Sequence, residues 1–200
     1  MNLNSYVRHL KESFFVSEKP LFYRFDEWKK DTHGKLFVVG SMGSEKETYA
    51  KKVARAFDCG VIDLDNLLKI YVSKFIMKNP DIDVDKLSNE EANSIHKQII
   101  SDMYFDIKKK KERKVIEGIQ IIWMPREELL NNNSVVLFRS SELVSIWSVI
   151  NTRMKGGSSK RIKFSKIIGD ILLNTFIKEM KSFRLDLIKR IGEYGHLETY

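Results

Sequence analysis

An apolar run that leads directly into a glycine-containing loop is the feature that most constrains the fold of this chain. Residues 36–39 read Leu-Phe-Val-Val, a continuous run typical of a strand buried on both faces of a sheet. The loop after it follows a phosphate-binding pattern of Gly, four residues, Gly-Lys and then Ser or Thr. Gly40 and Lys46 occupy pattern positions, whereas Glu45 replaces the second pattern glycine and Glu47 replaces the hydroxyl residue. The sequence therefore predicts a strand that enters an altered phosphate-binding loop.

The loop positions carry the chemistry of phosphate binding. Backbone N–H groups of such a loop surround a phosphate at the N-terminus of the next helix, where the helix dipole also favours an anion. The lysine contacts the β- and γ-phosphates, and the hydroxyl residue after it holds magnesium. The residues predicted to contact a nucleotide are Gly40, Ser41, Gly43, Ser44, Lys46 and Thr48.

Two acidic residues depart from the pattern. Glu45 places a negative charge beside the phosphates, and Glu47 offers a carboxylate that can bind magnesium but would repel the phosphates at short range. Thr48 follows one position later, about 100° around the helix from the expected hydroxyl. We therefore expect weakened nucleotide binding. The other interpretation is a strand-to-helix turn whose glycines serve packing alone.

The chain continues as an alternation of predicted strands and helices. Helices are predicted over residues 46–57, 67–77, 88–111 and 141–154, and strands over 61–65, 114–122 and 135–138. This alternation predicts an α/β fold with a parallel sheet of four or five strands flanked by helices. Ligands bind such sheets at the carboxyl ends of the strands. The charged residues predicted at these ends are Asp63, Asp65, Glu117 and Arg139.

Two helical regions flank the predicted sheet. Residues 1–33 are expected to form an N-terminal helical arm, and residues 34–200 one domain with a basic lid and C-terminal helices over 153–191. Residues 153–190 contain 11 Lys or Arg and 3 acids, a surplus equal to the net charge of +8 of the whole chain. Concentrated positive charge indicates a polyanionic partner, either a nucleotide or a nucleic acid, and a protein partner is the alternative. The Lys108–Lys111 run is either a solvated helix C-terminus or a nucleic-acid contact.

Composition excludes several classes of protein. One cysteine and four scattered histidines form neither an internal disulfide nor a zinc cluster. No run approaches the roughly 20 apolar residues that a membrane-spanning helix needs. We therefore expect a cytoplasmic protein that does not contact a membrane.

Residues 37–52, followed by 61–65, resemble the P-loop kinases of the nucleoside, nucleotide and shikimate type. The resemblance implies ATP or another nucleotide with magnesium as cofactor, and an acid, Asp65 or Asp63, near the phosphoryl acceptor. It also implies that Glu117 orients magnesium or its water, and that basic lid residues including Lys160 cover the phosphates. The predicted catalytic residues are Asp65, Glu117, Arg153 and Arg161, and the predicted magnesium ligands are Glu47 and Glu117.

A narrower resemblance covers most of the chain. Residues 22–28, 117–120 and 145–147, together with the loop, are similar to small uncharacterised P-loop proteins of tailed bacteriophages. This resemblance implies the host cytoplasm as the location.

Three functions follow as hypotheses. The first is a kinase-like nucleotide-binding protein with a degenerate Walker A loop and impaired or lost phosphotransferase activity. The second is an active ATP-dependent kinase of small molecules or polynucleotides. The third is a catalytically silent phage component that binds nucleic acid or has a structural role. Each acid also has a simpler interpretation, because an Asp before a helix is most often a helix cap.

Overall fold

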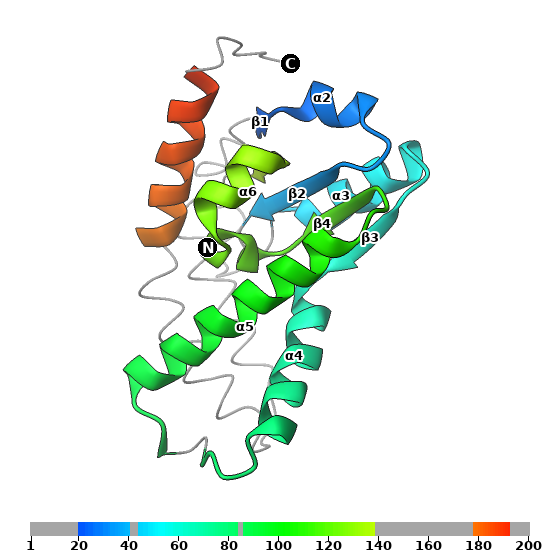
Figure 1. The fold of residues 1–200 in the computed structure, drawn as a ribbon. Helices are drawn as coiled ribbons and strands as arrows, with labels where there is room; N and C mark the ends of the chain where they lie inside the picture. The colour runs from blue at the N-terminus through cyan, green and yellow to red at the C-terminus, as the bar shows by residue number, and fades with distance from the viewer. Residues whose placement is uncertain (1–19, 41–43, 84–85, 139–177, 193–200) are drawn as a thin grey trace, which may run out of the picture.

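The computed structural model describes residues 20–40, 44–83, 86–138 and 178–192 of the chain (Figure 1). Residues 178–192 are helical, in agreement with the helical C-terminal region expected from the sequence. The other elements, in chain order, are β1 (Leu21–Tyr23), α2 (Phe25–Lys30), β2 (Lys35–Gly40), α3 (Lys46–Ala56), β3 (Gly60–Asp63), α4 (Leu64–Lys78), α5 (Asn89–Lys109), β4 (Lys114–Glu117), the 3₁₀ helix η2 (Ile119–Trp123), α6 (Arg126–Asn132) and β5 (Ser134–Phe138).

Five strands form one mixed sheet in the order β1-β5-β2-β4-β3. The pairs β2–β4, β2–β5 and β3–β4 are parallel, and β1 is antiparallel to β5. The expectation of a parallel sheet is therefore right for four strands and wrong for the fifth. All six residues of the central strand β2 are buried, as the apolar run predicted.

The edge strand β1 corrects one prediction. The spacing of Phe22, Phe25 and Trp28 indicated a single helix, but Phe22 lies in β1 and only the later residues lie in α2. Phe22 and Tyr23 pack on opposite faces of the sheet, as a strand requires. Arg24 has φ 53°, a left-handed conformation that separates the strand from the helix. The division of the chain at residue 33 stays a prediction.

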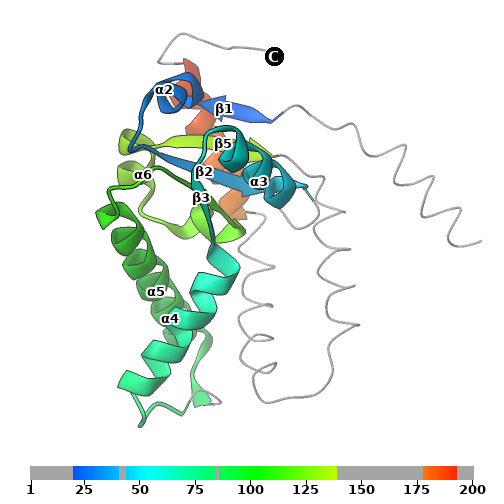
Figure 2. The ribbon, with the colours of Figure 1, turned by 90° about the vertical axis from the view of Figure 1, so that its right-hand side faces the viewer.

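The sheet separates two apolar layers (Figures 1 and 2). Leu36 and Val38 of β2 face the smaller layer, where α2 and α3 pack. Phe37 and Val39 face the larger layer, which contains buried residues of α5, η2, α6 and the helix over 178–192. This alternation is the period of two that a strand gives when both of its faces are covered.

Local sequence explains three further differences from expectation. The third strand ends at Asp63 rather than residue 65, because the Asp63 carboxylate caps α4. Asp65 therefore lies in the first helical turn and not at the strand end. Strand β4 ends at Glu117, since Gly118 has φ +153° and η2 begins one residue later. Helix α6 occupies most of the segment between the predicted strands over 114–122 and 135–138, where no helix was predicted.

Arg126 of α6 bonds to three polar side chains of the helix over 178–192, and Arg190 of that helix bonds to Glu127 and Asn131 of α6. The Arg126 guanidinium lies 3.0 Å from Glu179 and 2.8 Å from Asp186, and it donates a hydrogen bond of 2.8 Å to Ser182 Oγ. Phe183 is fully buried behind these contacts, with the guanidinium 5.7 Å from the centre of its ring. None of the helices in the described ranges is long and apolar enough to cross a bilayer.

The variant Arg126→Ala is expected to reduce the free energy of unfolding by about 1–3 kcal/mol, because Glu179 and Asp186 would lose their shared cation. Urea unfolding measures the loss, and amide hydrogen exchange should show faster opening of residues 178–192. Lys178→Ala is the control, since Lys178 is exposed on the same helix and should change stability by no more than about 0.5 kcal/mol. Equal effects of the two variants would refute the anchoring role.

Candidate functional site

The topology places a switch point between the carboxyl ends of β2 and β4, and open α/β sheets have their binding crevice at such a point. Strand β2 leads to α3 on one face of the sheet, whereas its neighbour β4 leads to η2 and α6 on the other. Two adjacent strands whose following segments diverge to opposite faces form a switch point, and ligands of open α/β sheets bind there. Helices on both faces thus fix the place of the site independently of any motif.

On the β2 side, Gly40 ends the strand in a crowded position. A Cβ atom at Gly40 would collide with Ser44 Oγ and lie 2.9 Å from Phe138 Cβ. The Ser44 hydroxyl is buried and has no hydrogen-bond partner within the described ranges. Ser41 and Gly43, the other predicted loop contacts, lie outside the described residues.

The chain enters α3 through a residue with a left-handed backbone conformation. Glu45 precedes the helix with φ 62° and ψ 10°, a left-handed conformation that a glycine adopts at little cost. Lys46 is the first residue of α3. The side chain of Glu47 is 62% exposed and lies 2.5 Å from Lys51 Nζ, while Thr48 is exposed. The residue before α3 thus has a backbone conformation in which a glycine would be less strained than Glu45.

On the β4 side, Glu117 is a buried carboxyl group. Its exposed fraction is 5%, and it pairs in register with Val38 of β2 and with Asp63 of β3. Burial raises the pKa of Glu117 to about 7, the nearby Lys46 ammonium opposes that rise, and Asp63, Asp65 and Glu47 add to it. The structure therefore brings four other predicted residues within electrostatic reach of Glu117.

The two aspartates at the start of α4 differ in their hydrogen bonds. Asp63 Oδ1 accepts from the backbone N–H of Asp65 at 2.8 Å and of Asn66 at 3.2 Å, and Asp63 Oδ2 accepts from Asn66 Nδ2 at 2.5 Å. The helix-cap interpretation is therefore right for Asp63. Asp65 instead accepts a 2.5 Å hydrogen bond from Gln120 Nε2 across the site.

Gln120 is a site residue that the sequence did not single out. Its side chain is 5% exposed, and its Oε1 atom is buried without a hydrogen-bond partner in the described part of the chain. Gly118 makes room for it, because a Cβ at Gly118 would lie 2.5 Å from Gln120 Oε1 and 2.7 Å from Leu64 Cβ. The available signal was a glycine directly after an acidic strand end.

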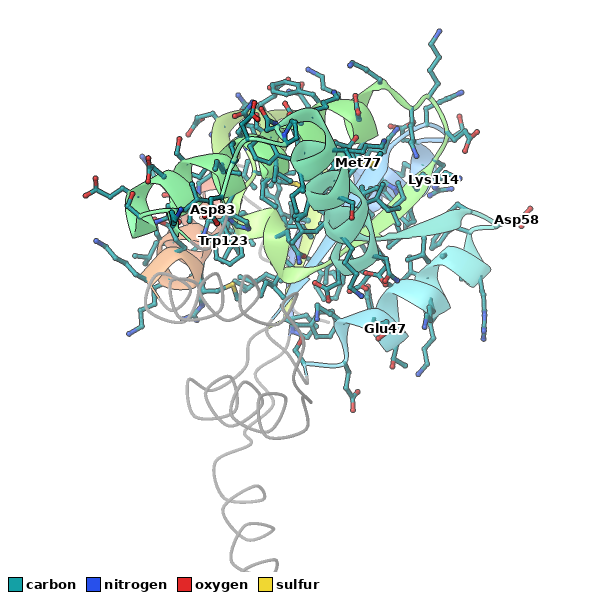
Figure 3. The ribbon with its side chains drawn as sticks, turned by 90° about the horizontal axis from the view of Figure 1, so that it is seen from below. Glu47, Asp58, Met77, Asp83, Lys114 and Trp123 are labelled. Atoms are coloured by element: carbon teal, nitrogen blue, oxygen red, sulfur yellow. The ribbon has the colours of Figure 1, made fainter. Side chains whose placement is uncertain are left out.

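Several predicted residues lie outside the described ranges. Arg139 and the lid residues Arg153, Lys160 and Arg161 are among them, so the lid stays a prediction. Figure 3 labels two residues on this side of the molecule, Glu47 in the first turn of α3 and Trp123 at the end of η2.

Magnesium would depend on the nucleotide at this site. Among the described residues, no group of three or more His, Cys, Asp or Glu side chains is arranged to hold a metal ion. Magnesium is commonly bound by one or two carboxylates together with substrate phosphates. Glu117 fits that mode once it is ionised, whereas Glu47 is already paired with Lys51.

Comparisons with known proteins add little to this geometry. No protein-family model matches the chain, and no curated protein matches it. Among the solved structures that resemble it is a gluconokinase from Sinorhizobium meliloti 1021, with 15% sequence identity. The match covers 82% of this chain and 99% of that one, with a TM-score of 0.33.

Proposed function

We propose that this chain is a P-loop kinase-like protein that binds the phosphates of a nucleotide between the carboxyl ends of β2 and β4. The observation that carries the proposal is the meeting of Lys46 and Glu117 at the switch point of the sheet. A cation at the start of a helix beside a crowded glycine suits an anion, because the helix dipole and the free backbone N–H groups add to its charge.

The geometry supports distinct roles for the residues around the crevice. Lys46 would contact the β- and γ-phosphates, with the backbone from Gly40 to Lys46 around them. When magnesium accompanies the nucleotide, it neutralises charge on the phosphates, and Glu117 is the carboxylate that could hold it. Asp65, which Gln120 orients, would lie on the side of a phosphoryl acceptor.

Impaired phosphotransferase activity is the second part of the proposal. Glu45 and Glu47 put two carboxylates next to the start of α3, where a nucleotide would bring several negative charges. Glu117 is partly protonated near pH 7 and therefore a weaker metal ligand than an ordinary glutamate. These features favour weak binding and slow or absent transfer.

An active small-molecule or polynucleotide kinase is the alternative. The hydrogen bond between Gln120 and Asp65 favours it, since a carboxylate held in one orientation suits a general base. The remaining hypothesis, a silent component that contacts nucleic acid or a protein through the region 153–191, stays a prediction because most of that region lies outside the described residues.

The double variant Glu45→Gly with Glu47→Ser is expected to tighten ATP binding by about tenfold or more in the presence of magnesium, because it removes two repelling charges and relieves the left-handed glutamate. Isothermal titration calorimetry of both proteins measures the change. The matched control, Asp81→Asn with Glu90→Gln, removes two exposed acids away from the crevice and should leave the affinity unchanged. A double variant that binds no tighter than the control would contradict the repulsion argument.

A further inference from the structure

The opposite edge of the sheet gathers three segments around one arginine. The Arg113 guanidinium lies 4.1 Å from the centre of the Trp28 ring of α2 and 4.6 Å from that of Phe57, which caps α3. Its Nη2 atom also donates a 2.7 Å hydrogen bond to the Trp28 carbonyl oxygen. The ends of α2 and α3 and the α5–β4 connection are thereby held together, and Figures 1 and 2 show the α2–β2 and α5–β4 connections at the same end of the sheet.

A second buried cation fixes the α5–β4 connection. Lys35 is 9% exposed and its Nζ atom donates to the carbonyl oxygens of His33, Lys110 and Glu112 at 3.2, 2.5 and 3.0 Å. Arg113 and Lys35 therefore hold residues 110–113 against the rest of the fold from both sides. Figure 3 labels Lys114, which begins β4, and Asp58, which follows the C-terminal end of α3.

This arrangement leaves a surface of unpaired positive charge, which we call the basic edge. Its members are exposed, and none makes an ion pair or a side-chain hydrogen bond with the residues that the structure describes. They come from the end of α2, the end of α3 and the α5–β4 connection. The basic edge consists of Lys30, Arg55, Lys110 and Lys111.

Acidic residues near the basic edge only partly offset it. Glu112 is paired with Lys114 at 2.7 Å, whereas Asp31 and Asp58 are exposed without an ion pair to a described residue. Four exposed cations, with Lys35 and Arg113 behind them, thus face two unpaired carboxylates.

Offsetting a helix dipole does not explain the whole of the basic edge. Cations in the last helical turn are favourable, which accounts for Lys30 and Arg55. In α5 this role belongs to Lys108 and Lys109, which are already paired with Glu128 and Asp106. Lys110 is the C-cap residue of α5 and can act in the same way, whereas Lys111 lies beyond the cap and its charge has no such explanation.

We propose that the basic edge binds the phosphate backbone of a nucleic acid without regard to its sequence. Among the large hydrophobic residues that are exposed in the described ranges, only Val61, at the amino end of β3, lies at this end of the sheet, and Trp28 is 2% exposed. Docking of a protein or insertion into a bilayer normally needs apolar or aromatic anchors, which this surface lacks. Contacts with nucleic-acid phosphates need only cations, so a duplex is the partner that the surface fits best.

The basic edge lies at the amino ends of the strands and the nucleotide crevice at their carboxyl ends. The inference is therefore independent of the proposed function. A variant that removes the basic edge should keep the ATP affinity of the unaltered protein.

The test measures binding of a random-sequence DNA duplex to the full chain across salt concentrations. Lys30, Arg55, Lys110 and Lys111 are all changed to Gln in one variant. Four exposed lysines elsewhere, Lys74, Lys78, Lys97 and Lys178, are changed to Gln in the control, which has the same net charge. Each phosphate contact contributes about 0.9 to the slope of log affinity against log salt.

The basic-edge variant is expected to lose about 3 units of slope and at least about tenfold in affinity at 0.1 M salt, while the control keeps both. Equal losses in the two variants would show a diffuse charge effect and overturn the proposal. An unchanged slope in both would also overturn it, and would assign any DNA binding to the region 153–191. A competition experiment adds polyglutamate at the same concentration of charge as the duplex. If polyglutamate displaces the duplex, the partner is an acidic protein and the nucleic-acid proposal is overturned.

Discussion

Gly118→Ala is expected to reduce the free energy of unfolding by about 3–4 kcal/mol. Two causes act together. Gly118 has φ +153°, a backbone conformation that residues with a Cβ rarely adopt. The new methyl would also lie 2.5 Å from Gln120 Oε1 and 2.7 Å from Leu64 Cβ, and both atoms belong to packed elements. Urea unfolding monitored by circular dichroism measures the loss.

Gly192→Ala is the matched control for that variant. No atom of the described residues lies within 4 Å of a Cβ at this glycine, which is in the helix over 178–192. Alanine is a better helix former, so the control should be neutral or slightly stabilising. A cost below about 1 kcal/mol for Gly118→Ala would show that the turn after β4 is not tightly packed around Gln120.

Glu117→Gln is expected to stabilise the protein at pH 8 by up to about 3 kcal/mol relative to its effect at pH 4. Burial raises the pKa of Glu117 from 4.5 to about 7, so between these values the folded chain holds a proton that the unfolded chain has released. Stability is therefore full below pH 4.5 and falls as the pH rises through 7. Glutamine carries no charge at any pH and removes this loss.

Unfolding free energies of Glu117→Gln and the unaltered protein are compared at pH 4, 6 and 8. Their difference isolates Glu117, because other titrating groups, such as the buried His96 whose pKa burial lowers to about 4, contribute to both proteins. Glu90→Gln is the control, since Glu90 is exposed on α5 and should show no such trend. A difference that does not change with pH would mean that Glu117 ionises normally.

Local patterns were sufficient to predict the centre of this fold. The run Leu36–Val39 has no polar residue, so only a strand covered on both faces could accommodate it. The position of Lys46 after that strand then predicted the start of α3 and the direction of the site. Ser88 and Glu91 form the capping box that predicted the start of α5.

Long-range pairing was beyond the local patterns. Strand β1 has three residues and pairs with β5 through Leu21 and Leu137, more than 100 positions apart in the chain. Periodicity over three residues does not separate a strand from a helix. Asp63 caps α4, so Asp65 lies in the first turn of that helix and not at the strand end. The local sequence does not tell which of the two aspartates is the cap.

The residues of the candidate site also divide into those that local patterns predicted and those that depend on long-range contacts. The pattern located Gly40, Lys46 and Glu117, whereas Gln120 became visible only through its hydrogen bond to Asp65 from another element. The left-handed backbone conformation of Glu45 was likewise not predictable from the local pattern.

Titration of ATP with magnesium into the unaltered protein and into Lys46→Met tests the central claim most directly. Lys52→Met, an exposed lysine of α3 outside the first turn, is the matched control. We expect saturable ATP binding to the unaltered protein and to the control. In Lys46→Met we expect the ATP affinity to fall at least about tenfold, because the ammonium group that would contact the phosphates is gone. Absence of saturable binding at millimolar ATP, or equal affinity in all three proteins, would contradict a nucleotide site between β2 and β4.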